Sequence, residues 1–190
     1  ETFTMIGKPI MSIKELLDNI GDKVWELYSK GLTCTLNQCD SDWAMSLVKQ
    51  YKPKSLGELT MFVAAIRPSF NSWRDKFIAR ESYTTGSKEL DKVLESTNGY
   101  ILFQENLMQY FDWLGVTPAE SIGLIKKISK KKIHQEDFDK LEGRLRNKWI
   151  ENTGSEYMFA ETWRMIQSCI SYGFAAPHAL AVAIDSLYGA

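Results

Sequence analysis

The sequence predicts a mainly α-helical protein with little or no β-structure. Apolar residues recur at helical spacing along most of the chain, and prolines and capping residues stand where such segments would begin or end. With 190 residues and 44% hydrophobic composition, the chain is long enough to bury one core. We therefore expect a single helical domain that spans residues 1–190.

The first part of the chain is predicted to form short helices separated by glycine and proline. Gly21 interrupts one periodic segment, Pro53 ends another, and the residue before Pro68 is disfavoured in a helix. Residues 32–39 alternate weakly, which allows a short strand or an extended segment. The expected helices are the two halves of 12–30, a segment capped by Asp40 or Ser41 that runs to Tyr51, and residues 54–66 and 69–80.

The second part of the chain begins with a predicted loop at residues 84–87 and continues with longer helices. Apolar residues between Asn98 and Leu114 fall on one helical arc, and Gln104 lies in the middle of that arc. Thr117 is a strong helix start, with Pro118 in the first turn and Glu120 placed to reach back to the cap. The expected helices are 98–114, 117–131, 135–151, 155–171 and a last one opened by Pro177.

Composition excludes several classes of protein. The formal net charge is −1, from 23 basic and 24 acidic residues, so any attraction to nucleic acid must come from local clustering. The three cysteines have no C-x-x-C spacing, which argues against a zinc finger or a disulfide framework. No apolar run approaches the roughly 18 residues needed to cross a bilayer, and no signal peptide is recognisable. We expect a cytoplasmic protein without membrane contact, and both ends resemble cuts within a longer polypeptide.

A lysine cluster stands at the end of one predicted helix. Residues 126–132 contain five lysines, and Lys126, Lys127, Lys130 and Lys131 share an arc of roughly 140°. The cluster could simply complement the negative end of the helix dipole and stay in water. It could equally form a surface that contacts phosphate groups.

Three further residues have both a structural and a functional interpretation. Gln104, on an apolar helix face, is either a buried hydrogen bonder with satisfied partners or a ligand contact. Glu105 faces a flank of the same helix and could pair with a lysine or arginine. His178 follows a helix start where Ala176 offers no side-chain acceptor, so free backbone donors there would suit an anion, or water could satisfy them.

Basic and aromatic residues are interleaved between residues 67 and 80. This composition can follow a nucleic-acid backbone and stack on bases, and it is also what an amphipathic helix with a wet face looks like. The residues are Arg67, Arg74, Lys76 and Arg80 among Phe70, Trp73 and Phe77. The pair Asp40 and Asp42 is common at helix starts and is rejected as a two-metal site, and His134 is interpreted as a surface residue.

Two stretches together with the lysines resemble a known family. Gly99 to Gln109 reads G-Y-I-L-F-Q-E-N-L-M-Q and is similar to Y-G-I-(I/L)-(L/V)-Y-Q-E-Q-V-M-Q in the α subunit of bacterial DNA polymerase III, a C-family polymerase. Lys130 to Lys132 fall where that family has G-K-K-K. Ser171 to Phe174, followed by His178, resemble G-Y-G-F-N-K-S-H.

Blocks further upstream extend the resemblance to the order and spacing of five segments. Lys52-Pro53 and the segment 64–68, which reads A-A-I-R-P, resemble K-P followed by A-L-(Y/F)-R-P, and residues 38–41 resemble F-Q-L-E-S. The five segments hold their order over residues 25–183. The resemblance covers most of the chain.

The resemblance implies a multi-helix fingers domain that closes over the incoming deoxynucleoside triphosphate. The implied partners are primer-template DNA, that triphosphate and the remaining polymerase domains. The residues implied to bind nucleotide or DNA are Arg67, Gln104, Glu105, Lys126, Lys130, Lys131, Lys132, Tyr172 and His178.

Departures from the family pattern indicate a divergent member. Ile125 replaces the first of two arginines, and Ala175, Ala176 and Pro177 replace Asn-Lys-Ser, so bidentate phosphate recognition is reduced. The palm carboxylates that hold two magnesium ions in the family are not among these 190 residues. We expect no catalytic residue and no cofactor in this chain, magnesium in the parent polymerase, and no activity of the chain alone. The alternative is a stand-alone, non-catalytic helical module that binds nucleic acid or protein.

Overall fold

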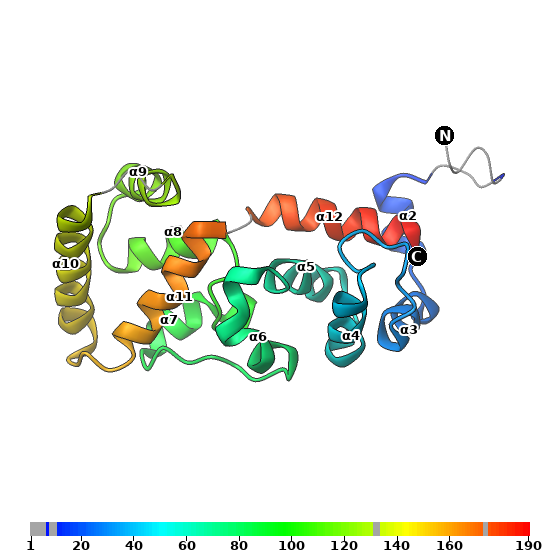
Figure 1. The fold of residues 1–190 in the computed structure, drawn as a ribbon, viewed down its shortest axis with the longest axis horizontal. Coiled ribbons are helices and arrows are strands. Elements are labelled where there is room, and N and C mark those ends of the chain that lie inside the picture. The colour runs from blue at the N-terminus through cyan, green and yellow to red at the C-terminus, as the bar shows by residue number, and fades with distance from the viewer. Residues whose placement is uncertain (1–6, 8–10, 131–133, 173–174) are drawn as a thin grey trace. The chain divides into compact units, whose positions relative to one another are not determined.

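All regular secondary structure in the described residues is helical, which confirms the predicted fold class (Figure 1). The computed structural model describes residues 7, 11–130, 134–172 and 175–190. The α-helices are α2 (Ile13–Asn19), α3 (Asp22–Lys30), α4 (Asp42–Tyr51), α5 (Leu56–Ala65), α6 (Asn71–Ile78), α7 (Lys88–Val93), α8 (Gln104–Trp113), α9 (Pro118–Ser129), α10 (Gln135–Thr153), α11 (Phe159–Tyr172) and α12 (Ala176–Gly189). The 3-10 helices are η1 (Pro68–Phe70) and η2 (Glu95–Thr97).

Side-chain caps explain why several predicted helix starts are confirmed. Ser12 forms a capping box with Glu15 at the start of α2. The Ser41 hydroxyl accepts a hydrogen bond from the backbone N–H of Ala44 at 3.2 Å, and Thr117 caps α9 in the same way. The carboxylate of Glu120 does not reach back to that cap, because it binds Arg144 of α10 at 2.6 Å.

Two sequence-based expectations about secondary structure are wrong. Residues 32–39 form turns instead of a strand, and the Thr33 hydroxyl donates to the Cys39 carbonyl at 2.6 Å to hold them. The helix expected from Asn98 begins only at Gln104, because residues 99–103 leave the helical conformation to pack into the core. Helix α7, which the Ser87 side chain caps, was not predicted.

The described chain divides into two compact units, and we describe each by itself. Unit 1 comprises residues 1–60 and 180–190, and unit 2 comprises residues 61–179, so the divisions fall inside α5 and α12. In unit 1, α3 packs against α4, and the buried Tyr28 hydroxyl lies 2.8 Å from the Ser186 hydroxyl at the C-terminal end of α12. Burial raises the pKa of Tyr28 above its ordinary value, with the Ser186 hydrogen bond opposing that rise.

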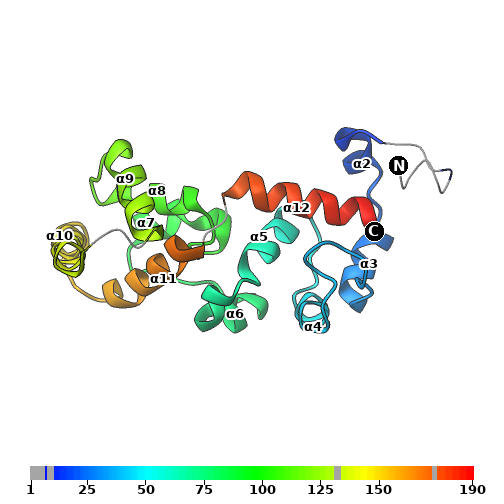
Figure 2. The ribbon, with the colours of Figure 1, turned by 45° about the horizontal axis from the view of Figure 1, so that its top comes forward.

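Unit 2 is built around aromatic side chains. Helix α11 packs against η1, α8 and α9, and the views in Figures 1 and 2 show α8 and α11 side by side. The Tyr100 ring makes edge contacts with Phe70 and Phe77, at centroid distances of 5.7 and 5.5 Å. Gly99 allows this packing, because its φ is +84° and a Cβ there would lie 1.9 Å from the Tyr83 carbonyl oxygen.

None of the helices in the described part of the chain is both long and apolar enough to cross a membrane.

Candidate functional site

The start of α8 sets the positions of two predicted site residues. Asn106 is only 4% exposed, and its Oδ1 accepts hydrogen bonds from the backbone N–H groups of Leu102 at 3.3 Å and Phe103 at 3.1 Å. The helix therefore begins at Gln104, and Gln104 and Glu105 are exposed in its first turn. The expectation that Gln104 lies within the apolar face is wrong, since the buried amide of this segment is Asn106.

Glu105 binds the first residue of α12. The backbone N–H of Ala176 donates to Glu105 Oε2 at 2.9 Å, across 71 residues of sequence. A carboxylate at this position is favoured by the positive end of the helix dipole. The expectation of free donors at this helix start is thus wrong for Ala176, because a carboxylate of the same chain occupies its N–H. His178 is exposed in the same turn.

Arg67 lies inside unit 2, with 5% of its surface exposed. Its guanidinium carbon is 5.9 Å from the centroid of the Phe70 ring, and its carbonyl oxygen accepts a hydrogen bond from Arg74 at 2.8 Å. Burial lowers the pKa of Arg67, and the neighbouring Cys169 thiol of α11 opposes this effect.

Cys169 of α11 neighbours the guanidinium of Arg67. Burial raises the pKa of the Cys169 thiol to about 11, Arg67 opposes the rise, and the Glu105 carboxylate adds to it. Cys169 neighbours Arg67, and Glu105 binds the start of α12; we call these residues together the α12 cluster. No sequence signal marked Cys169, because it lies on α11 and meets the other members only through packing.

The lysine cluster is a separate feature. Lys126 and Lys127 are exposed in the last turn of α9, and Lys130 is its exposed C-cap. Helix α9 packs against α8 and α11, but no hydrogen bond or ion pair between described residues joins these lysines to the α12 cluster. Lys131 and Lys132 lie outside the described residues, and the Tyr172 side chain at the end of α11 is also outside them.

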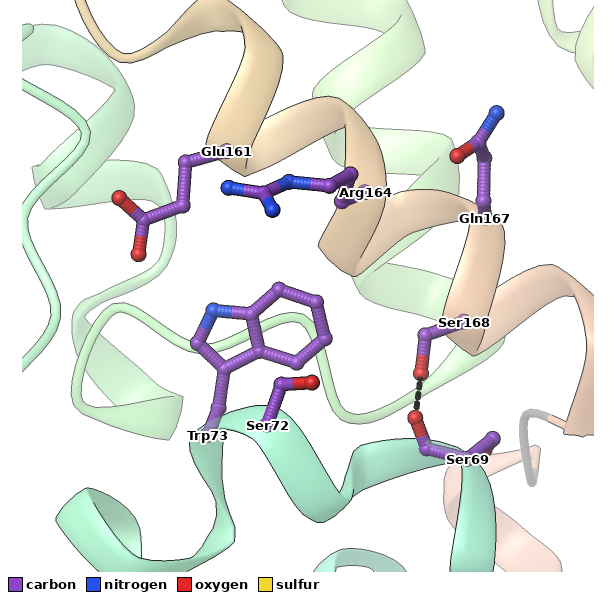
Figure 3. Close-up of a pocket in the computed structure, with 7 residues that line it drawn as sticks. All are labelled: Ser69, Ser72, Trp73, Glu161, Arg164, Gln167 and Ser168. Atoms are coloured by element: carbon purple, nitrogen blue, oxygen red, sulfur yellow. Dashed lines mark hydrogen bonds between the residues drawn. The ribbon is translucent and has the colours of Figure 1, made fainter.

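A pocket that sequence reasoning missed lies between α6 and α11 (Figure 3). Its volume is about 480 Å³, and the Ser168 hydroxyl, which donates to the Ser69 carbonyl, links its two walls. Only Trp73 of its lining had been singled out from the sequence. The lining residues are Ser69, Ser72, Trp73, Glu161, Arg164, Gln167 and Ser168.

Together these features define a helical domain that presents exposed cationic and hydrogen-bonding groups. Among the described residues, no group of three or more histidine, cysteine, aspartate or glutamate side chains could hold a metal ion. Residues 7–153 match the model of the bacterial DNA polymerase III alpha subunit finger domain, and the chain belongs to this family. The kinship suggested by the five sequence segments is confirmed.

Relatives of the chain are much longer polymerases. The chain is 30% identical over 179 residues to DNA polymerase III subunit alpha of Aquifex aeolicus, which covers 88% of this chain and 15% of the relative. It is 28% identical over 192 residues to the Bacillus subtilis subunit, covering 95% of this chain and 17% of that protein. An error-prone DNA polymerase of Symbiobacterium thermophilum is 29% identical over 194 residues, with coverage of 96% and 18%. The chain thus spans less than a fifth of the length of these relatives.

Proposed function

We propose that the chain serves as the fingers region of a DNA-directed DNA polymerase, where it binds primer-template DNA and the incoming deoxynucleoside triphosphate. The observation that carries this proposal is the exposed lysine end of α9 in a chain of this family. The remaining polymerase domains would be its partners, in the cytoplasm.

The lysines of α9 have positive charge that no side chain in the described part of the structure neutralises. Lys126, Lys127 and Lys130 form no ion pair with another described residue, whereas Lys30 pairs with Glu26 at 2.9 Å and Lys148 with Glu151 at 2.6 Å. Phosphate groups attract such a surface strongly because binding releases condensed counterions. Lys131 and Lys132 continue the cluster in the sequence and lie outside the described residues.

The α12 cluster would position the remaining binding groups. Glu105 fixes the first turn of α12 through the Ala176 amide, so His178 is held at an exposed helix start. Gln104, exposed beside Glu105, and Tyr172 would contact nucleotide or DNA. Arg67 would act from inside, where its buried guanidinium lies near the Phe70 ring and neighbours Cys169.

The family substitutions predict that this chain binds DNA more strongly than it binds the triphosphate. Ala175 and Ala176 supply no side-chain donor, and the Ala176 amide is already bound to Glu105. A triphosphate that approached the start of α12 would therefore meet a carboxylate with few compensating donors.

Chemistry would depend on metals held elsewhere in the parent polymerase. Magnesium ions on palm carboxylates would activate the primer hydroxyl and neutralise the charge that develops on the transferred phosphoryl group. The residues of this chain bind and orient the substrates, so the chain alone should not extend a primer.

Salt-dependent binding of a labelled primer-template duplex tests the proposal. Changing Lys126 and Lys130 to Ala removes two exposed positive charges. If both contact phosphate, the slope of log affinity against log salt should fall by about 1.8, since each contact contributes roughly 0.9.

The matched control is Lys140→Ala with Lys148→Ala, which removes the same charge from exposed positions of α10. It should leave the slope nearly unchanged. Equal slopes for both double variants would show that the lysine surface is not part of the DNA-binding site. Absence of any salt-dependent binding by the wild type would favour the stand-alone protein-binding module.

A further inference from the structure

The pocket between α6 and α11 has two walls that are held in place by contacts within the chain. The Ser168 hydroxyl of α11 donates to the Ser69 carbonyl of η1, and Phe70 packs against Trp73 with centroids 6.1 Å apart. The hydrogen bond joins the two walls of the pocket, and the aromatic contact packs Phe70 against Trp73 within one wall. The volume of about 480 Å³ lies within the range of about 300 to 1,000 Å³ that is typical of ligand sites.

Polar groups that line this pocket have hydrogen-bonding capacity left over. In the described part of the chain, the side chains of Glu161, Arg164 and Gln167 make no hydrogen bond or ion pair, and Figure 3 shows them around the opening. The Ser69 hydroxyl oxygen is buried and has no hydrogen-bond partner among the described residues. Because an unsatisfied buried hydroxyl is unfavourable, a ligand that offers it a partner is favoured.

The chemistry of the lining indicates the class of ligand. A carboxylate and a guanidinium on the same rim disfavour a simple anion and a simple cation alike. Hydrogen-bond donors and acceptors alternate along the lining, beside the indole of Trp73 and the exposed guanidinium of Arg164. This arrangement suits a neutral planar group whose edge carries both hydrogen-bond donors and acceptors. An unpaired nucleobase has these properties, and such bases are bound by aromatic or guanidinium faces and by edge hydrogen bonds.

We propose that this pocket binds one unpaired base of the template strand. The proposal rests on the proposed function, because it assumes that the chain binds primer-template DNA. It adds a site for single-stranded template that is distinct from the lysine surface and the α12 cluster. Gln167 and Glu161 would bind the base edge, Arg164 would lie against its face, and the Ser69 hydroxyl would bind a polar atom at the bottom.

Three DNA probes separate recognition of the base from recognition of the phosphates. The first is a blunt duplex, the second carries a short template overhang of thymidines, and the third carries an overhang of the same length built from abasic nucleotides. The thymidine overhang should bind the full chain about tenfold more tightly than the abasic overhang, since base stacking supplies this difference. The combined variant Arg164→Ala with Gln167→Ala should abolish the difference.

Arg144→Ala is the matched control, because Arg144 is an exposed arginine of unit 2 that binds Glu120 outside the pocket. It should keep the tenfold preference, and thermal melting should confirm that both variants fold. Equal affinity for the two overhangs, or a preference that persists in the pocket variant, overturns the pocket proposal. If the blunt duplex still binds in a salt-dependent manner, the proposed function stands. Failure of all three probes to bind overturns both.

Discussion

The segment from Gly99 to Gln109 and the lysine end of α9 both carry the family resemblance, yet the structure places them in opposite environments. Tyr100, Ile101 and Leu102 are completely buried, whereas the described lysines of α9 are exposed. The first segment is therefore mainly a structural element, and its residues act on the site through the backbone that they fix. The lysine end depends little on packing and contributes mainly charge.

This difference in burial explains how Glu105 reaches the backbone N–H of Ala176. The buried Asn106 fixes the start of α8, so the first turn of this helix presents Glu105 toward the start of α12. An exposed side chain is thus held in place by a buried neighbour. Variants can test whether the two regions really divide stability and binding between them.

The largest effect is expected at Gly99. Changing it to Ala should lower the free energy of unfolding by more than about 3 kcal/mol, because the Cβ would clash with the Tyr83 carbonyl oxygen at a positive φ. Chemical denaturation followed by circular dichroism measures the change. Gly123→Ala is the control, since no atom lies within 4 Å of a Cβ there and Ala should stabilise α9 by about 0.5 to 1 kcal/mol. Similar stabilities for the two variants would contradict the structural role of Gly99.

A smaller loss of stability is expected at Asn106. Replacing it with Ala removes the acceptor for two buried backbone N–H groups, which should cost about 1 to 3 kcal/mol. Gln104→Ala changes the exposed neighbouring amide and should alter unfolding by less than about 0.5 kcal/mol. If both substitutions had the same effect, Asn106 would not be the residue that fixes α8.

Alkaline pH should lower the free energy of unfolding of the chain, because of a buried thiol. An unfolded cysteine has a pKa near 8.5, whereas burial raises the pKa of Cys169 in the folded chain to about 11. Between these values the unfolded state binds fewer protons, so stability falls as pH rises, by at most about 1.4 kcal/mol per pH unit for this group. Cys169→Ala should make that fall shallower in denaturation measured under reducing conditions. An unchanged slope would show that this thiol does not contribute.

The smallest effect on stability is expected at the lysines. Lys126→Ala with Lys130→Ala relieves repulsion between like charges four residues apart, so the free energy of unfolding should change by no more than about 0.5 kcal/mol. Thermal melting at low salt measures it. A large loss of stability would show that these lysines stabilise the fold, which contradicts the interpretation that they only form a binding surface.

Local signals in the sequence predicted most helices correctly. Ser12, Ser41 and Thr117 mark helix starts because each side chain binds a backbone group only three residues away. The start of α8 was misplaced because apolar periodicity continues through residues 99–103, which are buried but not helical. Apolar periodicity indicates which residues are buried, but it does not by itself show whether a buried segment is helical.

The sequence alone determined the helical fold class and the position of the lysine cluster, because these depend on composition and on interactions within a few residues. It indicated the family through the resemblance of five segments. Only the tertiary structure decided that Glu105 binds Ala176, that Arg67 is buried and that a pocket opens between α6 and α11. Each of these features joins residues far apart along the chain. Such contacts arise when helices pack, and no local pattern of residue types specifies which side chains will meet.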